Sequence, residues 1–276
     1  MSTRSEPWPA GTPCWTDLST SDPAAAREFY AALFGWDLQV GPPETGEYAM
    51  ALKHGLPVVG VNGMAAQPGQ PTTWVVYLAT DDAQASVDAA AAAGASVIVP
   101  AMDVMTFGRM ALVVDPTGAA VGLWQAGSHL GSQVVNEPSA VTWAELMTRD
   151  LDAAQDFYRT VFGYDVEAVE MPSAAGRYDT ISVGGRVVGG LGEMPVDVPA
   201  EMPPFWTVYF GVDDTDDTVA RLRSLGGAVL RDPADTPFGR MAVVADPQGA
   251  GFVVIRPPDG AGRPGEQPAE AVDRDA

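Results

Sequence analysis

Two short segments of the chain place a carboxylate two residues after a tryptophan, in Trp15 to Asp17 (WTD) and in Trp143 to Glu145 (WAE). Both segments alternate like β-strands, in which residues i and i+2 point to the same face, so each indole is expected beside its carboxylate. A carboxylate packed against an indole loses solvation, which raises its pKa and lets it exchange a proton near neutral pH. The same arrangement could recognise a polar group of a ligand, or it could fill the core of a domain.

The chain offers few side chains that bind transition metals. Its only cysteine, Cys14, excludes an internal disulfide framework, and its only histidines are His54 and His129. His54 is expected in a hairpin turn and His129 in a polar connector, so we expect both to be solvated surface residues. A metal held by Asp17, Glu145 or other carboxylates is a minor alternative.

The carboxylate segments belong to a longer internal repeat. Residues 15–37 and 143–165 are identical at eleven of 23 aligned positions, and residues 107–119 and 238–250 at ten of 13. The offset of about 130 residues is too long for a solenoid repeat and is typical of a duplicated domain. The function must therefore be one that two linked copies of a small domain can perform.

The repeat sets the expected domain boundaries. We predict an N-terminal arm, a first domain, a linker rich in Gly, Ser, Asn and Pro, a second domain, and a disordered acidic tail. These segments cover residues 1–11, 12–126, 127–139, 140–257 and 258–276. In each domain a strand should lead to a helix that begins after Asp22 or Asp150 and ends at Gly35 or Gly163. Three strands follow, and the whole βαβββ pattern then restarts near Thr73 and Trp206.

These motifs resemble the vicinal oxygen chelate superfamily, which includes glyoxalases, bleomycin-resistance proteins and dioxygenases. The resemblance covers nearly all of the chain between Thr12 and Pro257. It is carried by the helix-capping Asp, a helical Phe-Tyr, a Phe-Gly that ends the helix, and Asp-Pro-x-Gly before the last strand. These are Asp22, Phe29-Tyr30, Phe34-Gly35 and Asp115 to Gly118 in the first copy, and Asp150, Phe157-Tyr158, Phe162-Gly163 and Asp246 to Gly249 in the second. The resemblance implies an α+β fold of tandem glyoxalase-like domains, with four βαβββ units whose mixed sheets form cups.

The resemblance also implies a divalent metal in each cup, with ligands at fixed distances from these motifs. The chain departs from that pattern at every such position, where the resemblance expects His, Gln or Glu. The residues present are Trp15, Val75 and Gly122 in the first copy, and Trp143, Thr207 and Val253 in the second. None of these side chains supplies an imidazole, carboxylate or thiolate. We therefore predict that the protein uses no metal and no other cofactor.

If the superfamily's ligand positions face the cup, residues two further along each strand face it too. The candidate acid–base pairs are then Asp17 with Tyr77 and Glu145 with Tyr209. The side chains predicted to contact a ligand are Trp15, Trp74, Trp124, Trp143, Trp206 and Thr207. Aromatic faces of this kind suit flat, conjugated or cationic molecules. The opposing interpretation is that Trp15 and Trp143 fill the space of the metal and leave a packed core.

A second repeated motif, Phe-Gly-Arg-Met, contains Phe107 with Arg109 and Phe238 with Arg240. We include these four residues among the candidate ligand contacts, because the arginine could clamp an anionic ligand. Alternatively, each arginine could form an ion pair with an acid across the domain interface.

The favoured function is metal-free binding, and sequestration, of an aromatic or polycyclic metabolite or antibiotic in one or both cups. The main alternative is a metal-independent isomerase, cyclase, lyase or ring-opening hydrolase that uses the acid–base pairs. Further alternatives are an interaction module with vestigial cups and a metal-dependent glyoxalase.

The net charge of −21, from 15 Lys and Arg against 36 Asp and Glu, argues against nucleic-acid and anionic-membrane partners. With no signal-peptide pattern and no long apolar run, we expect a cytoplasmic protein. Because both halves are joined in one chain, a monomer could supply the arrangement that many relatives form by pairing two chains, so we expect a monomer or a homodimer.

Overall fold

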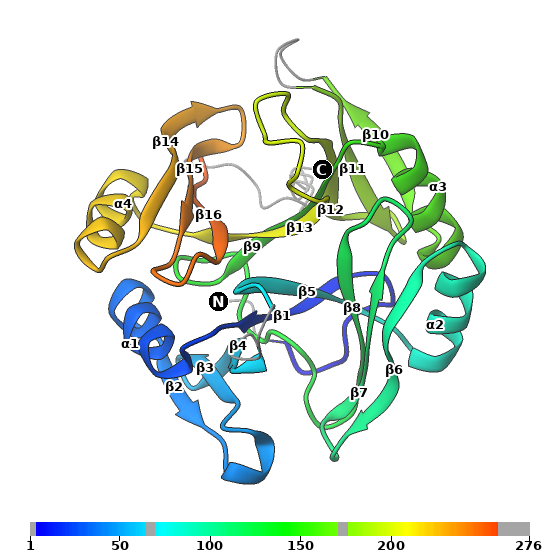
Figure 1. Cartoon of the computed structure of the whole chain (residues 1–276), viewed down its shortest axis with the longest axis horizontal. Helices are drawn as coiled ribbons and strands as arrows, with labels where there is room; N and C mark the ends of the chain where they lie inside the picture. The colour runs from blue at the N-terminus through cyan, green and yellow to red at the C-terminus, as the bar shows by residue number, and fades with distance from the viewer. Residues whose placement is uncertain (1–3, 65–69, 171–175, 259–276) are drawn as a thin grey trace, which may run out of the picture.

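The computed structural model describes residues 4–64, 70–170 and 176–258. Apart from Pro258, the predicted acidic tail lies outside these residues, as do the first three residues of the predicted arm. The described part of the chain forms two eight-stranded mixed sheets and four α-helices, an α+β arrangement (Figure 1). No helix within the described ranges is both long enough and apolar enough to span a membrane.

The first domain contains two βαβββ units. The first unit is β1 (Pro13–Ser19), α1 (Pro23–Phe34), β2 (Asp37–Val40), β3 (Ala49–Lys53) and β4 (Leu56–Asn62), with a short 3₁₀ turn η1 (Pro43–Thr45). The second unit is β5 (Thr73–Ala79), α2 (Ala83–Ala92), β6 (Ser96–Val104), β7 (Gly108–Val114) and β8 (Ala120–Ala126). The strands assemble in the order β2-β3-β4-β1-β5-β8-β7-β6, so the two units join where β1 and β5 pair antiparallel.

The second domain repeats this plan. Its first unit is β9 (Val141–Thr148), α3 (Leu151–Phe162), β10 (Asp165–Val169), β11 (Tyr178–Val183) and β12 (Arg186–Glu193). Its second unit is β13 (Phe205–Gly211), α4 (Thr215–Ser224), β14 (Ala228–Thr236), β15 (Gly239–Ala245) and β16 (Gly251–Arg256). The strand order is β10-β11-β12-β9-β13-β16-β15-β14. The four βαβββ units predicted from the repeat are therefore confirmed, and each sheet is completed within its own domain.

The helix signals act as the sequence predicts. The Asp22 carboxylate accepts a hydrogen bond from the Ala25 backbone N–H at 3.1 Å, and Asp150 accepts one from Ala153 at 3.0 Å. Gly35 follows α1 with a φ of 72°, in the left-handed region that favours glycine. Each N-cap contributes about 1 kcal/mol to helix stability and fixes where the chain leaves the preceding strand.

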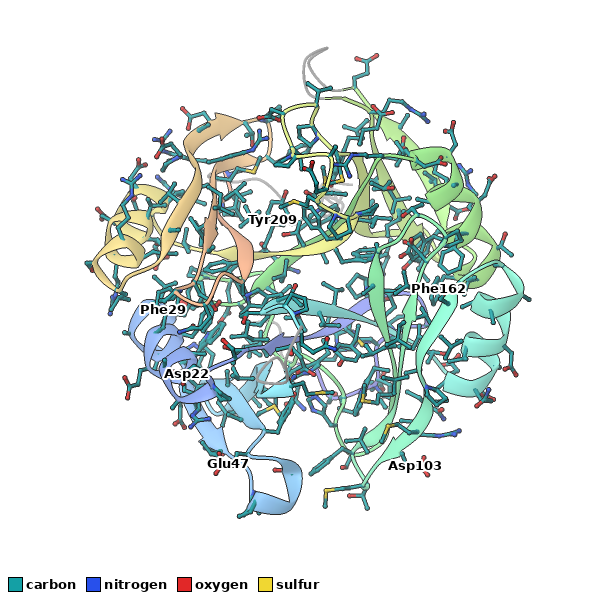
Figure 2. The ribbon with its side chains drawn as sticks, in the orientation of Figure 1. Asp22, Phe29, Glu47, Asp103, Phe162 and Tyr209 are labelled. Carbon is teal, nitrogen blue, oxygen red and sulfur yellow. The ribbon has the colours of Figure 1, made fainter. Side chains whose placement is uncertain are left out.

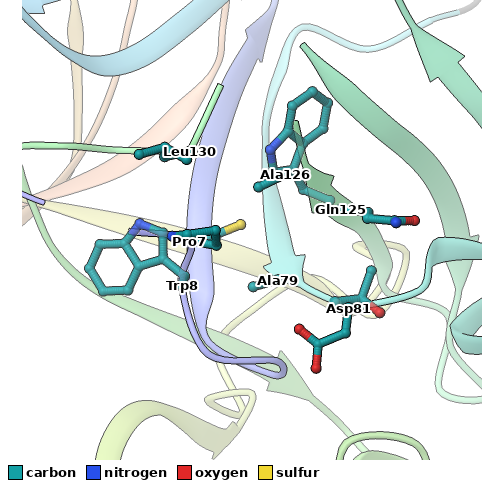
Figure 3. A pocket seen from close by; sticks show the side chains of 10 residues that line it. Pro7, Trp8, Ala79, Asp81, Gln125, Ala126 and Leu130 are labelled. Carbon is teal, nitrogen blue, oxygen red and sulfur yellow. The ribbon is translucent and has the colours of Figure 1, made fainter. Parts of the chain in front are cut away.

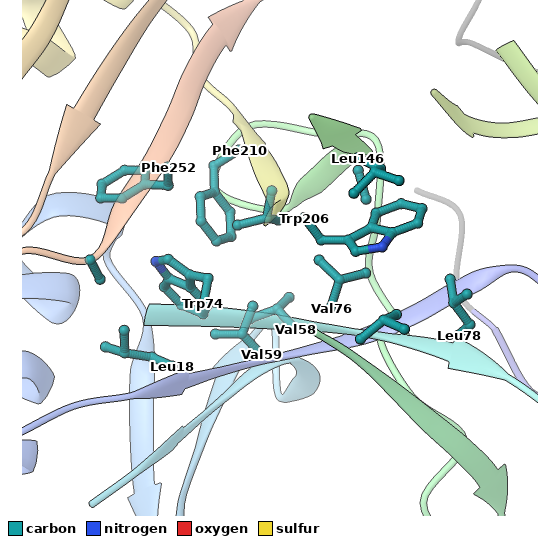
Figure 4. Packing of buried hydrophobic residues seen from close by; sticks show 14 of the residues in the cluster. Leu18, Val58, Val59, Trp74, Val76, Leu78, Leu146, Trp206, Phe210 and Phe252 are labelled. Atoms are coloured by element: carbon teal, nitrogen blue, oxygen red, sulfur yellow. The ribbon is translucent and has the colours of Figure 1, made fainter. Parts of the chain in front are cut away.

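The two domains share one apolar core. One face of each sheet packs against the other, with side chains from β1, β4, β5, β9, β13 and β16 between them (Figure 4). Helix α1 contacts α4 and helix α2 contacts α3, on opposite sides of the molecule in Figure 1. The opposite face of each sheet is turned away from this core. We call these outer faces the first cup, around Trp15 and Asp17, and the second cup, around Trp143 and Glu145.

The repeated motifs join the domains. The Tyr30 hydroxyl donates to Asp246 Oδ2 at 3.1 Å, and the Tyr158 hydroxyl donates to Asp115 Oδ2 at 3.0 Å. Asp115 Oδ1 meanwhile accepts backbone N–H groups of its own turn, including that of Gly118 at 3.0 Å. The helical Tyr of each copy thus binds the Asp-Pro-x-Gly turn of the other copy. The residues that carry the family resemblance stabilise the pairing of the two domains.

Candidate ligand-binding cups

A buried carboxylate lies at the floor of the first cup. Asp17 is 8% exposed, and its Oδ1 accepts hydrogen bonds from Trp15 Nε1 at 2.8 Å and from the Tyr48 hydroxyl at 2.6 Å. Tyr77 pairs with Trp15 across β1 and β5, which places the phenol on the same face of the sheet. The expected neighbours Asp17, Tyr77 and Trp15 therefore do come together.

The second cup repeats this arrangement with a longer acid. Glu145 is 7% exposed; its Oε1 accepts from the Tyr209 hydroxyl at 2.5 Å and its Oε2 from the Tyr178 hydroxyl at 2.8 Å. Trp143 Nε1 donates to the Tyr178 hydroxyl at 2.9 Å. Tyr209 lies on the side of the second sheet that is turned away from the first domain (Figure 2). We call Glu145, Tyr178, Tyr209 and Trp143 the Glu145 cluster.

Two glycines provide the room for these clusters. A Cβ atom at Gly60 would lie 1.8 Å from the Tyr48 hydroxyl oxygen and 2.1 Å from Asp17 Oδ1. A Cβ atom at Gly190 would lie 2.0 Å from the Tyr178 hydroxyl oxygen. Both glycines are the β-sheet neighbours of the acids, on β4 and β12. Only glycine at these positions lets a phenol approach the carboxylate so closely.

The clusters replace the metal centre that the fold implies. At Gly122, one of the positions expected to supply a ligand, the space of a Cβ atom is taken by the Tyr77 ring, 2.2 Å away. The remaining positions hold indoles, valines and one threonine, which do not supply the donors that a divalent ion requires. Across the residues that the structure describes, no three His, Cys, Asp or Glu side chains are grouped to hold a metal ion. The side chains present therefore do not fit the implied metal.

Burial dominates the electrostatics of both cups. Loss of solvation raises the pKa of Asp17 and of Glu145, while hydrogen bonds from the tyrosines and tryptophans act in the opposite direction. Burial next to these acids also raises the pKa of Tyr77 and Tyr209 well above 10. The phenols therefore remain protonated at any physiological pH and serve as hydrogen-bond donors, not as bases.

The predicted linker covers the first cup, which corrects the expectation for His129. Its imidazole is not a solvated surface group: it lies edge-on against the rings of Trp15 and Trp124, with centroids 4.4 and 5.5 Å away. Burial lowers the pKa of His129 from 6.5 to about 4. Nearby, Ser132 binds strand β1 through a backbone hydrogen bond of 2.7 Å to the Cys14 carbonyl. His54, in contrast, is exposed as expected, with half of its side chain accessible.

Trp74 and Trp206 do not belong to either cup, so the predicted ligand contacts at these residues are wrong. Both indoles lie in the interdomain core, each 4% exposed. Their N–H groups donate to the hydroxyls of Tyr30 and Tyr158, at 3.2 and 2.8 Å. Trp74 and Trp206 come one residue before the cup-facing positions Val75 and Thr207. Because successive strand residues point to opposite faces, both indoles point away from the cups. Thr207, the next residue after Trp206, is half-buried and pairs with Glu145 across the sheet.

The repeated arginines also point away from the cups. Met110 and Met241 contact the cup clusters, so Arg109 and Arg240, one residue earlier, lie on the opposite face. Arg109 pairs with Asp103 at 2.9 Å, and Arg240 pairs with Asp216 and Asp235. These acids belong to the arginine's own domain, so neither the anion clamp nor the ion pair across the interface is present.

The phenylalanines of the same motif are partly exposed, Phe107 by 40% and Phe238 by 44%. The centroids of the Phe238 and Tyr178 rings are 6.2 Å apart, so Phe238 reaches the Glu145 cluster. Trp124 packs in the first cup, and Ile255 occupies the equivalent position in the second cup.

Sequence reasoning missed two tyrosines that complete the clusters, Tyr48 and Tyr178. Tyr48 immediately precedes β3 and Tyr178 begins β11, two short strands without a conspicuous motif. Both hydroxyls donate to the buried acids. A signal was available, since the segments YAMALKHG and YDTISVGG place a tyrosine at the same distance before a turn glycine in each copy.

Comparison with known families agrees with this fold. A family model described as "Glyoxalase/Bleomycin resistance protein/Dioxygenase superfamily" matches residues 14–123 and 140–254. Two curated relatives align over most of their length. "Putative glyoxylase CFP32" of Mycobacterium tuberculosis (strain CDC 1551 / Oshkosh) is 44% identical over 262 residues, which cover 93% of this chain and 98% of the relative. "Anthracycline biosynthesis protein DnrV" of Streptomyces peucetius is 39% identical over 260 residues, which cover 89% of this chain and 93% of the relative.

Solved structures share the architecture at low sequence identity. The Mn(II)-bound glyoxalase from Novosphingobium aromaticivorans superposes with a TM-score of 0.62 at 16% identity, over 89% of this chain and 82% of that chain. The 2,3-dioxygenase LapB from Pseudomonas sp. KL28 superposes with a TM-score of 0.64 at 13% identity, over 94% and 95% of the two chains. At these identities the similarity establishes the fold alone.

Proposed function

We propose that this chain, which belongs to the glyoxalase/bleomycin resistance protein/dioxygenase superfamily, binds a flat polycyclic aromatic metabolite in its second cup without a metal ion. The observation that carries the proposal is the Glu145 cluster. Its carboxylate is buried and accepts hydrogen bonds on both oxygens. Aromatic side chains thus occupy the place of the metal centre, which supports a site for a flat ring system.

The hydrogen bonds of the cluster favour binding through aromatic faces. The Tyr178 and Tyr209 hydroxyls donate to Glu145, and the Trp143 N–H donates to Tyr178. Because these polar groups are already engaged, the rings are held in place and offer mainly apolar surface to a ligand. Rings fixed before binding lose little conformational entropy when a ligand stacks on them.

The second cup is the better candidate because the first is covered by the chain itself. His129 occupies the space above Trp15 and Trp124. In the second cup, within the described residues, Trp143 is half-buried and Phe238 is 44% exposed. Trp143 and Phe238 both contact Tyr178, the first through a hydrogen bond and the second through its ring. A flat ligand that lies over Tyr178 could therefore contact both.

The relatives support a polycyclic ligand. The name of DnrV refers to anthracycline biosynthesis. Anthracyclines have a tetracyclic skeleton that contains a planar anthraquinone. The name of CFP32 refers instead to glyoxylase activity. A glyoxalase of the metal-dependent kind needs ligands that the cups of this chain do not supply, so we favour the aromatic ligand.

A second candidate function is a metal-independent enzyme acting on the same ligand class. The observation in its favour is the raised pKa of Glu145, because burial favours the protonated form of the acid, which could donate a proton. Against it, both carboxylate oxygens already accept phenol hydrogen bonds, so a substrate would have to displace Tyr178 or Tyr209.

Titration of a fluorescent anthracycline with the purified protein tests the proposal. The wild-type protein should bind one equivalent, and Trp143→Leu should weaken binding by at least about tenfold because it removes a stacking surface. The matched variant Trp15→Leu, at the equivalent position of the covered cup, should bind as the wild type does. Both variants are first compared with the wild type by circular dichroism, and only folded protein is titrated.

Equal loss in both variants, or no binding by the wild type, would overturn the assignment to the second cup. The ligand recovered after incubation, analysed by chromatography, separates the two functions. Unchanged ligand supports a binding protein. Conversion that stops in Glu145→Gln, while binding persists, supports the enzyme.

A further inference from the structure

A small pocket lies at the rim of the first cup, apart from the Glu145 cluster, and Asp17 does not line it (Figure 3). It has a volume of about 150 Å³ and lies between the N-terminal arm, the ends of β5 and β8, and the start of the linker. A cavity of about this size accommodates a single aromatic ring. Trp8 and Leu130 line it from the arm and the linker, Thr80 and Asp81 from the segment after β5, and Trp124 from β8.

Two indoles of the pocket are held by hydrogen bonds to the linker. Trp8 Nε1 donates to the Ser132 carbonyl at 3.1 Å, and Trp124 Nε1 donates to the His129 carbonyl at 3.0 Å. Each ring therefore has its one polar group engaged and presents carbon surface to the pocket. Because the rings are positioned before any ligand arrives, a ligand that contacts them orders few side chains.

The charged residue of the pocket lining is acidic. Asp81 is exposed at its edge, and the lining contains no Lys or Arg. Figure 3 shows Trp8 on one side of Ala79 and Asp81 on the other. The chain as a whole carries a net charge of −21, which raises the local concentration of cations. Anionic ligands are disfavoured by the same charges.

The Trp8 ring already attracts a cation. The guanidinium carbon of Arg4 lies 4.2 Å from the centroid of the Trp8 ring, and Arg4 is not among the residues that line the pocket. The contact shows that this indole accepts a cation on its ring face, as tryptophan does more strongly than other aromatic side chains. Trp124 offers a second indole of the same kind, 7% exposed.

From these observations we infer that the rim pocket binds a small organic cation, such as an aromatic or quaternary ammonium group, between Trp8, Trp124 and Asp81. The site is separate from the Glu145 cluster, and its ligand differs from the polycyclic aromatic proposed there in size and charge. The indoles supply cation–π and apolar contacts, and Asp81 supplies a counter-ion at the pocket mouth.

Titration calorimetry with three matched probes tests this inference on the full chain. Benzyltrimethylammonium should bind, while benzyl alcohol and benzoate, which are neutral and anionic, should bind at least about fivefold more weakly. Asp81→Asn should weaken the cation by about threefold at low salt and less at high salt, because exposed charge pairs are screened. Trp8→Leu should weaken it by about fivefold or more. Trp143→Leu, in the second cup, should leave it unchanged.

A second measurement keeps the test independent of variant folding. In the wild-type protein, the indole N–H resonances of Trp8 and Trp124, assigned by Phe substitutions, should shift on addition of benzyltrimethylammonium, and that of Trp143 should not. Equal binding of all three probes, absence of binding at millimolar concentration, or shifts confined to Trp143 would each overturn the inference. Failure of the anthracycline titration would leave these results unaffected, since it reports on Trp143.

Discussion

Gly190→Ala removes no ligand contact, yet we expect it to disrupt the second cup. The new Cβ atom would lie 2.0 Å from the Tyr178 hydroxyl oxygen and 2.5 Å from the Tyr178 Cζ atom. Gly190 does not have a positive φ, so the backbone itself tolerates alanine and only the space is lacking. The Tyr178 ring must therefore move away from Glu145.

The cost follows from the hydrogen bonds that Tyr178 makes. Its displacement breaks the 2.8 Å bond to Glu145 Oε2 and removes the acceptor of the 2.9 Å bond from Trp143. A typical hydrogen bond contributes about 0.5–1.5 kcal/mol to stability, and a buried polar group left unsatisfied costs about 1–3 kcal/mol. These terms overlap, so we expect Gly190→Ala to lower the free energy of unfolding by about 2–4 kcal/mol.

Urea denaturation measures this change, with Gly251→Ala as the matched control. Gly251 also lies on a strand of the second domain, but a Cβ atom there would have the Val244 carbonyl oxygen as its nearest neighbour, 3.9 Å away. The control should stay within about 0.5 kcal/mol of the wild type. Gly190→Ala should in addition lose anthracycline binding, since the Trp143 ring loses its anchor. If both variants match the wild type in stability and binding, the tight cluster does not exist.

Three further outcomes are expected. Tyr158→Phe removes the bond to Asp115 across the domain interface and should lower the free energy of unfolding by about 1–3 kcal/mol, measured in urea; no change would mean that the bond contributes nothing to domain pairing. Burial raises the pKa of Glu145 above 4.5, so its stabilising contribution is complete below pH 4.5 and is lost as the pH rises through the folded-state pKa. The free energy of unfolding of the wild type should therefore fall relative to that of Glu145→Gln as the pH rises from 4 to 8. A rise relative to the variant would contradict the burial of Glu145. For His129 the sign is reversed: its pKa falls from 6.5 to about 4, so stability is lost as the pH falls through this range, and His129→Phe should lack this part of the acid loss.

The fold was predictable because the same helix and turn motifs occur in both halves of the chain. Identical residues at Asp22 and Asp150, and at Gly35 and Gly163, mark where each helix begins and ends, and their physical roles do not depend on distant contacts. The Trp-x-acid pattern likewise placed Asp17 and Glu145 on the cup faces, since strand alternation is local.

The remainder of the site depends on contacts that local patterns do not contain. Tyr48 and Tyr178 reach the acids only because glycines on neighbouring strands leave room, and that register is a property of the assembled sheet. The composition of the linker favoured an exposed His129, but composition does not reveal that the segment crosses the first cup. Trp74 and Trp206 are aromatic and lie beside cup-facing positions, yet their own alternation directs them into the core.

The central claim is that an aromatic cluster around Glu145 has taken the place of a metal centre and binds a flat ligand. The most direct test is a crystal structure of the protein grown with an anthracycline, with metal-specific anomalous data collected from the same crystal. We predict ring density stacked against Trp143 and Phe238, with Tyr178 and Tyr209 still bonded to Glu145. An anomalous peak for an ion beside Trp143 and Glu145, or a ligand bound elsewhere with the second cup empty, would contradict the claim.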